Sequence, residues 1–97
     1  MSYKISRYSY IKAKTLGVTI KPSTNPNKKI DVYKEGIKIA SIGDPDYLDY
    51  PNYLKLEKLG YFPEGYAEER RRNYYRRHRA TSRRKFSPSY YAKKILW

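Results

Sequence analysis

The chain has 97 residues, and its 22 Lys and Arg against nine Asp and Glu give a net charge of +13. A chain of this length forms one small domain, and such an excess of cations is typical of proteins that bind nucleic acid or an acidic protein surface. The absence of cysteine excludes a disulfide framework, a cysteine-ligated zinc site and a thiol nucleophile, and no apolar run is long enough for a membrane span or the core of a signal peptide.

The first third of the chain predicts one strand followed by a loop. Leu16, Val18 and Ile20 are spaced by two residues, which favours a strand over residues 15–20, while the looser alternation at the start of the chain assigns no element. Residues 22–27 hold two prolines and two asparagines, residue types that disfavour both strands and helices. We therefore expect a loop there.

A β-hairpin is predicted after this loop. Two segments rich in Ile and Val, residues 29–34 and 37–42, flank Glu35 and Gly36, and a two-residue connection containing glycine is typical of a hairpin. This register pairs Val32 with Ile39 and Ile30 with Ser41, and its apolar face consists of Ile30, Val32, Ile37 and Ile39.

Three helices are predicted in the second half, each from its end signals. A short helix over residues 51–59 has proline in its first position, and Gly60 can end it in a left-handed conformation. The main helix, residues 66–79, has acidic residues in its first turn and arginines at its end, as the helix dipole favours. Ser87 as N-cap with Pro88 in the first position predicts a last helix over residues 88–96.

These elements predict an α+β fold. We expect a small β-hairpin or sheet packed with two or three helices, among them an arginine-rich main helix and a C-terminal amphipathic helix. Residues 1–97 are expected to form a single small domain, with residues 1–22 as a candidate N-terminal extension or arm.

The main helix is the candidate binding element. Residues 68–85 hold nine Lys and Arg against two Glu, and Arg72, Arg76, Arg79 and Arg83 recur with helical spacing. Ala67, Tyr74 and His78 lie on a different side, by which the helix can dock, and a solvated basic face that binds nothing is the alternative. The candidate polyanion-binding residues are Arg72, Arg76, Arg79, Arg83, Arg84 and Lys85.

The aromatic residues of the two last helices are candidate anchors. Adjacent helical residues point about 100° apart, so the pairs Tyr74-Tyr75 and Tyr90-Tyr91 can each give one ring to the fold and one to an interface. A base-stacking role for the pairs is the alternative. Trp97 is too large and apolar to lack a covering surface. The candidate interface or anchor residues are Tyr75, Tyr90 and Trp97.

The sequence favours no metal site, cofactor or catalytic centre. His78 is the single histidine, and a metal site would need further ligands of the kind that cysteine or a second histidine supplies. Asp44, Asp46 and Asp49 do not have the spacing of a calcium loop, because Leu48 stands where the third ligand belongs, and turn or capping roles are expected instead. No arrangement gives His78 both a nucleophile and an orienting carboxylate, so we do not expect an enzyme.

Several short motifs lie within residues 23–97. They are Ser23-x-x-Pro26-x-Lys28-Lys29, the hairpin ending in Gly43, Asp46-Tyr47, Asn73-Tyr74-Tyr75-x-Arg77-His78-Arg79 and Phe86-Ser87-Pro88-x-Tyr90-Tyr91-x-x-x-Ile95-Leu96-Trp97. Together these motifs resemble small basic proteins encoded by tailed phages and large DNA viruses. The resemblance implies a viral origin and a virion-associated role, and it supplies no catalytic residues. The chain departs from the pattern in its long segment over residues 43–66 and its extension before residue 23.

From charge and resemblance together we expect a virion structural protein. It would be an auxiliary capsid or head protein that binds acidic capsid surfaces or packaged DNA through the arginine-rich helix. Its partners would be the major capsid protein or other virion proteins in a multi-copy assembly, with DNA as a further partner and no membrane. It would be located in the virion, assembled in the host cytoplasm. The alternative is a non-structural nucleic-acid-binding accessory protein.

Overall fold

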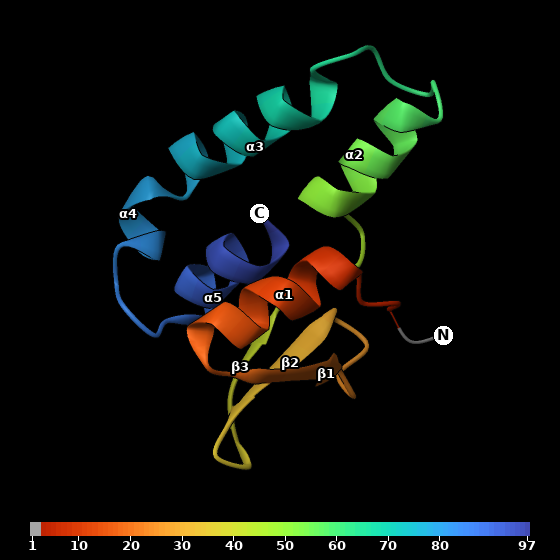
Figure 1. Cartoon of the computed structure of the whole chain (residues 1–97). Coiled ribbons are helices and arrows are strands. Elements are labelled where there is room, and N and C mark those ends of the chain that lie inside the picture. The colour runs from red at the N-terminus through yellow and green to blue at the C-terminus, as the bar shows by residue number, and fades with distance from the viewer. Residues whose placement is uncertain (1–2) are drawn as a thin grey trace.

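A three-stranded antiparallel sheet and the helices on one of its faces form the fold (Figure 1). The computed structural model describes residues 3–97, without the side chains of residues 81 and 82. Figure 1 shows α1 and α5 directly over the sheet, with α2 and α3 beyond them, so the predicted α+β class is confirmed. In chain order the elements are α1 (Arg7–Leu16), β1 (Thr19–Pro22), β2 (Ile30–Lys34), β3 (Ile37–Ile42), α2 (Tyr50–Lys58), α3 (Tyr66–Arg77), α4 (Arg79–Ser82) and α5 (Pro88–Leu96).

The hairpin of β2 and β3 has the predicted turn but a different register. Glu35 and Gly36, with φ of 52° and 79°, connect the strands in the left-handed conformation that tight hairpins need. Beyond the turn a β-bulge interrupts the ladder, so that Val32 pairs with Ala40 rather than with Ile39. The prediction from an uninterrupted ladder was wrong because a bulge adds one residue to one strand.

The bulge changes which residues of β3 reach the core. Ile30 pairs with Ile42 instead of Ser41, and Ile37, 67% exposed, and Ile39 lie outside the core. A shift of one residue turns every following side chain to the opposite face of a strand, which explains why the predicted apolar face is right for β2 and wrong for β3. The buried apolar residues of the sheet are Ile20, Ile30, Val32, Ala40 and Ile42.

The strand predicted over residues 15–20 was only partly correct. Residues 15 and 16 end α1, which closes at Gly17 (φ 74°), and β1 begins at Thr19. The buried residues of α1 are Ser9 and Ala13, one turn apart, and the Ser9 hydroxyl donates a 2.9 Å hydrogen bond to the main-chain oxygen of Ile95 in α5. Because the buried stripe of α1 consists of small side chains, no periodic pattern of large apolar residues marks this helix in the sequence.

Residues 3–22 lie within the packed structure. They form α1 and β1, and they contribute Ile5, Ala13, Val18 and Ile20 to the core. Residues 1 and 2 of the segment considered as a candidate arm are outside the described residues.

The helices of the second half agree with their end signals. α2 lies within one residue of the predicted 51–59, with Gly60 left-handed at φ 89°, and α5 has the predicted bounds, with the Ser87 hydroxyl accepting from the Tyr90 amide at 3.1 Å. α3 begins at Tyr66 as predicted but ends at Arg77, two residues early, and a separate short helix, α4, follows His78.

Candidate polyanion-binding surface

α3 docks by the side that its sequence predicts. Ala67 and Tyr74 are buried, and His78, half-buried, packs its ring 4.3 Å from that of Tyr74. The amide of Ala67 donates a 2.8 Å hydrogen bond to the carboxylate of Glu57 in α2, which satisfies one of the free amides at the start of α3. With this side held against the fold, other sides of the helix remain available for contacts.

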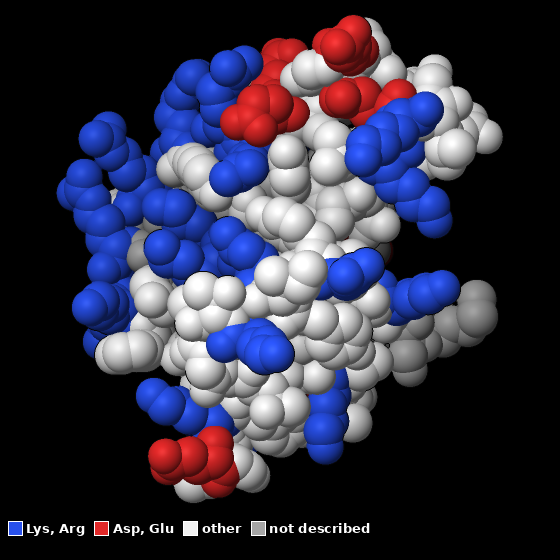
Figure 2. Space-filling view, in the orientation of Figure 1, with Lys and Arg blue, Asp and Glu red and all other residues white. Residues whose placement is uncertain are grey.

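Six predicted cations form an exposed group that we call the basic ridge. Figure 2 shows Lys and Arg gathered along the flank formed by α3, α4 and the loop after α4. All six side chains are exposed, and none forms an ion pair with a carboxylate of the described residues. The basic ridge consists of Arg72, Arg76, Arg79, Arg83, Arg84 and Lys85.

The basic ridge is not the single helical stripe that the spacing predicts. Arg72 and Arg76 lie on α3, Arg79 begins α4, and Arg83 to Lys85 follow α4. Since α3 ends at Arg77, the regular spacing does not continue beyond it, and this part of the prediction was wrong. The six positions instead follow the course of the chain through α3, α4 and the loop after α4, which curves in Figure 1.

Arg71 contrasts with the basic ridge because the fold uses its charge. Its guanidinium lies 4.8 Å from the ring centre of Tyr50 and 3.8 Å from a carboxylate oxygen of Glu68, and its Nε donates to the Tyr75 hydroxyl at 3.1 Å. An arginine held by an aromatic ring, a carboxylate and a hydroxyl is a packing residue. The cations of the ridge have no such carboxylate partners among the described residues.

The three predicted anchor residues differ in how much of each side chain is buried. Trp97 is only 7% exposed, and its ring stacks on Tyr74 at 4.4 Å between centres and 9° between planes. The hydroxyls of Tyr8 and Tyr75 donate to the main-chain oxygen of Trp97 at 3.0 and 3.1 Å. Trp97 therefore anchors its segment to the fold, whereas Tyr75 and Tyr90 are half-buried.

The candidate ligands considered for a metal have other roles. The pKa of His78 lies below its usual value, because burial and then the charge of Arg77 disfavour the imidazolium. As predicted, Asp49 caps α2, and Asp44 accepts the amide of Asp46 at 2.9 Å in a turn. Across the described residues, no three His, Cys, Asp or Glu side chains cluster as they would around a metal ion.

A pocket beside α3 brings together residues that the sequence did not group. Lys28 and Lys29 precede β2, whereas Arg70 and Arg77 lie on α3, and all four line this pocket. Some 40 residues separate the two pairs, so no spacing rule could have joined them, although Lys28 and Lys29 belong to one of the motifs behind the viral resemblance.

No protein family, curated protein or solved structure matches this chain. Within residues 3–97 no helix combines the length and the apolar character that crossing a membrane requires.

Proposed function

We propose that this protein is a polyanion-binding structural component of a virus particle, an auxiliary capsid or head protein. The observation that supports the binding role is the basic ridge, six exposed cations without a carboxylate partner among the described residues. The proposal of a viral role rests on the motifs of residues 23–97, which resemble those of small basic viral proteins.

Three properties of the basic ridge favour a polyanionic partner. Five of its six residues are arginines, whose planar guanidinium binds phosphate or carboxylate through two parallel hydrogen bonds. Unpaired like charges on one flank repel each other, and a partner of opposite charge removes that cost. The ridge also follows a curved flank, so several cations can reach one extended partner (Figure 2).

The same ridge supports a second candidate, a non-structural nucleic-acid-binding accessory protein. Charge alone does not separate DNA phosphates from acidic capsid side chains, because both attract guanidinium groups. The two candidates differ in where the protein is found and in what holds it there.

Salt dependence tests the binding role of the ridge. The triple variant R72A/R76A/R79A should bind a short DNA duplex more weakly, with a salt slope reduced by about 0.9 for each phosphate that the variant no longer neutralises. The matched control K4A/K14A/K58A removes the same charge from three exposed lysines outside the ridge and should keep the wild-type slope. Equal slopes for the ridge variant and the wild type, measured by fluorescence anisotropy, would contradict a role for the ridge in DNA binding.

Particle composition tests the structural role. Mass spectrometry of purified particles should find the protein at a fixed ratio to the major capsid protein, and nuclease treatment of opened particles should not release it. A protein that leaves with the DNA, or that is absent from particles and binds free DNA tightly, would favour the accessory role instead.

A further inference from the structure

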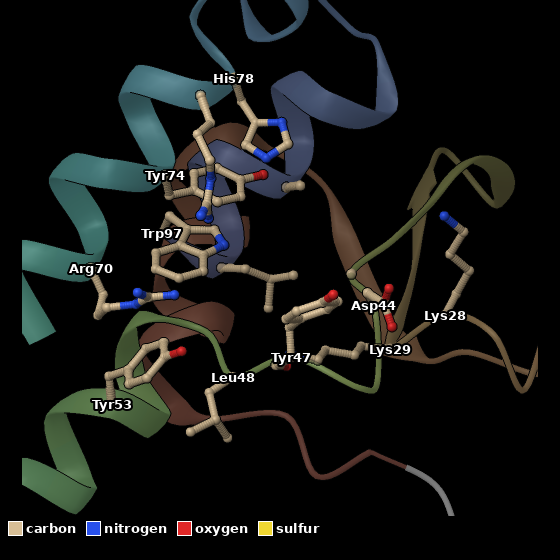
Figure 3. Close-up of a pocket in the computed structure, with 14 residues that line it drawn as sticks. Lys28, Lys29, Asp44, Tyr47, Leu48, Tyr53, Arg70, Tyr74, His78 and Trp97 are labelled. Carbon is tan, nitrogen blue, oxygen red and sulfur yellow. The ribbon is translucent and has the colours of Figure 1, made fainter.

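A pocket of about 420 Å³ lies between α3, the end of α5 and the loop after β3 (Figure 3). This volume falls in the range of about 300 to 1,000 Å³ that is usual for small-molecule sites. Two lysines and the loop after β3 form one side, with Lys28, Lys29, Gly43, Asp44, Tyr47 and Leu48. Arg70, Tyr74, Arg77 and His78 form the side on α3. Leu96 and Trp97 contribute the remaining side.

The side on α3 presents two arginines around one tyrosine. Arg70, Tyr74 and Arg77 follow one another at i, i+4 and i+7, a spacing that places them on one face of the helix. The guanidinium of Arg70 lies 5.6 Å from the ring centre of Tyr53. Its Nε is buried and has no hydrogen-bond acceptor among the described residues. A buried donor of a charged group without an acceptor is costly, and a bound anion would supply one.

The opposite side of the pocket contributes the exposed cation Lys28, and the backbone of Gly43 lies close to Leu96 and Lys29 there. Lys29 is balanced by Asp49 at 3.1 Å, so its charge is used within the fold, whereas Lys28 is exposed. A Cβ on Gly43 would lie 2.9 Å from side-chain atoms of Leu96 and Lys29, so only glycine fits there without displacing them. Among the described residues, the pocket lining holds the cations Lys28, Arg70 and Arg77 besides the paired Lys29, and one carboxylate, that of Asp44, so the lining is positive.

The pocket also offers aromatic surface. Tyr47 is 68% exposed, and its ring lies across the pocket from Trp97 in Figure 3. In the same view the indole nitrogen of Trp97 and the hydroxyl of Tyr74 point toward the open space of the pocket. Since the ring of Trp97 is already stacked on Tyr74, the free ring face for a ligand is that of Tyr47.

We propose that this pocket binds one nucleotide, with the phosphate at the cations and the base against Tyr47. Aromatic side chains beside Arg and Lys are the usual means of holding a base and its phosphate. A free nucleotide and one nucleotide of a single strand share this chemistry, and the proposal does not depend on the basic ridge.

Trp97 is the only tryptophan and lines the pocket, so its fluorescence reports occupancy. Thymidine 5′-monophosphate should change this fluorescence saturably. Thymidine and inorganic phosphate should each bind with an affinity at least about tenfold lower, because each lacks one half of the contacts. Hexathymidylate separates the two sources. Tighter binding of the oligonucleotide than of the mononucleotide indicates a single strand, and equal binding per site indicates a free nucleotide; either result supports the pocket.

Variants of exposed residues test the contacts with little effect on folding. K28A/R77A should lower the affinity for thymidine 5′-monophosphate about tenfold or more through the phosphate, and Y47A about fivefold or more through the base. K4A/K14A is the matched control for the removed charge, and the ridge variant R72A/R76A/R79A should bind the mononucleotide as the wild type does.

Three results would overturn the nucleotide site. The first is no saturable change of Trp97 fluorescence with either mononucleotide or hexathymidylate. The second is unchanged affinity in both K28A/R77A and Y47A. The third is binding of an acidic peptide at the pocket in place of nucleotides, which would assign it to a protein partner. Because the ridge variant is tested in the same assay, failure of the pocket and failure of the ridge are distinguishable.

Discussion

Replacing Lys29 with methionine is expected to lower the free energy of unfolding by about 3 to 5 kcal/mol, because it leaves a buried carboxylate without its cation. The Lys29 Nζ lies 3.1 Å from Asp49 Oδ2, and the two side chains are 5% and 1% exposed. The same Nζ donates to the main-chain oxygen of Tyr47 and lies 5.2 Å from the ring centre of Tyr3. Methionine preserves the length and apolar stem of the side chain, so the change removes mainly the charge.

The remaining hydrogen bonds of Asp49 place the expected loss toward the lower end of that range. Its carboxylate still accepts from the Tyr3 hydroxyl and from the side-chain amide of Asn52, the latter at 2.7 Å. A domain of this size has a total stability of about 5 to 15 kcal/mol, so a loss near 3 kcal/mol is a large fraction of it. The pair also joins the start of β2 to the N-cap of α2, so its removal should affect the whole fold rather than one loop.

Urea unfolding followed by circular dichroism measures the effect. K28M, at the exposed neighbouring lysine, is the matched control and should change stability by less than about 0.5 kcal/mol. D49N keeps a good N-cap residue while removing the charge, and the double variant K29M/D49N should be less destabilised than the sum of the two single variants. A loss below about 1 kcal/mol for K29M, or strict additivity in the cycle, would refute the reasoning about the buried pair.

Two further predictions concern the core and the acid limit of stability. W97A should cost about 3 to 5 kcal/mol, because it leaves a cavity beside Tyr74 where the two rings now stack, and an unchanged melting temperature would contradict this packing. The pKa of Asp31 lies below its usual value: burial alone would raise it, but hydrogen bonds from two serine hydroxyls and one amide, together with Lys38 at 3.6 Å, outweigh burial. The stability that the Asp31 carboxylate contributes is present above its unfolded pKa of about 3.9 and is lost as the pH falls through its folded pKa. D31N should therefore lose less unfolding free energy on acidification than the wild type does. Urea titrations at several pH values measure this difference.

Local signals in the sequence determined where most elements of the second half begin and end. A serine or aspartate N-cap acts on an amide three residues away, as Ser87 does on Tyr90 and Asp49 on Asn52, so neighbouring residues suffice to predict it. The exposure of the six cations of the basic ridge was predictable for a similar reason, because unpaired charges stay in water whatever the topology.

Tertiary structure decided the register of the hairpin, the buried face of α1 and the pocket. The bulge brings Ala40 and Ile42 to the core in place of Ile37 and Ile39, and either set is apolar enough to look buried in the sequence. α1 has local end signals in Ser6 and Gly17, but its buried face consists of the small residues Ser9 and Ala13, and the contact of Ser9 with α5 depends on a segment about 80 residues away. The sequence likewise showed no sign of the pocket, because its lining comes from distant parts of the chain, and contacts between distant segments carry no local pattern.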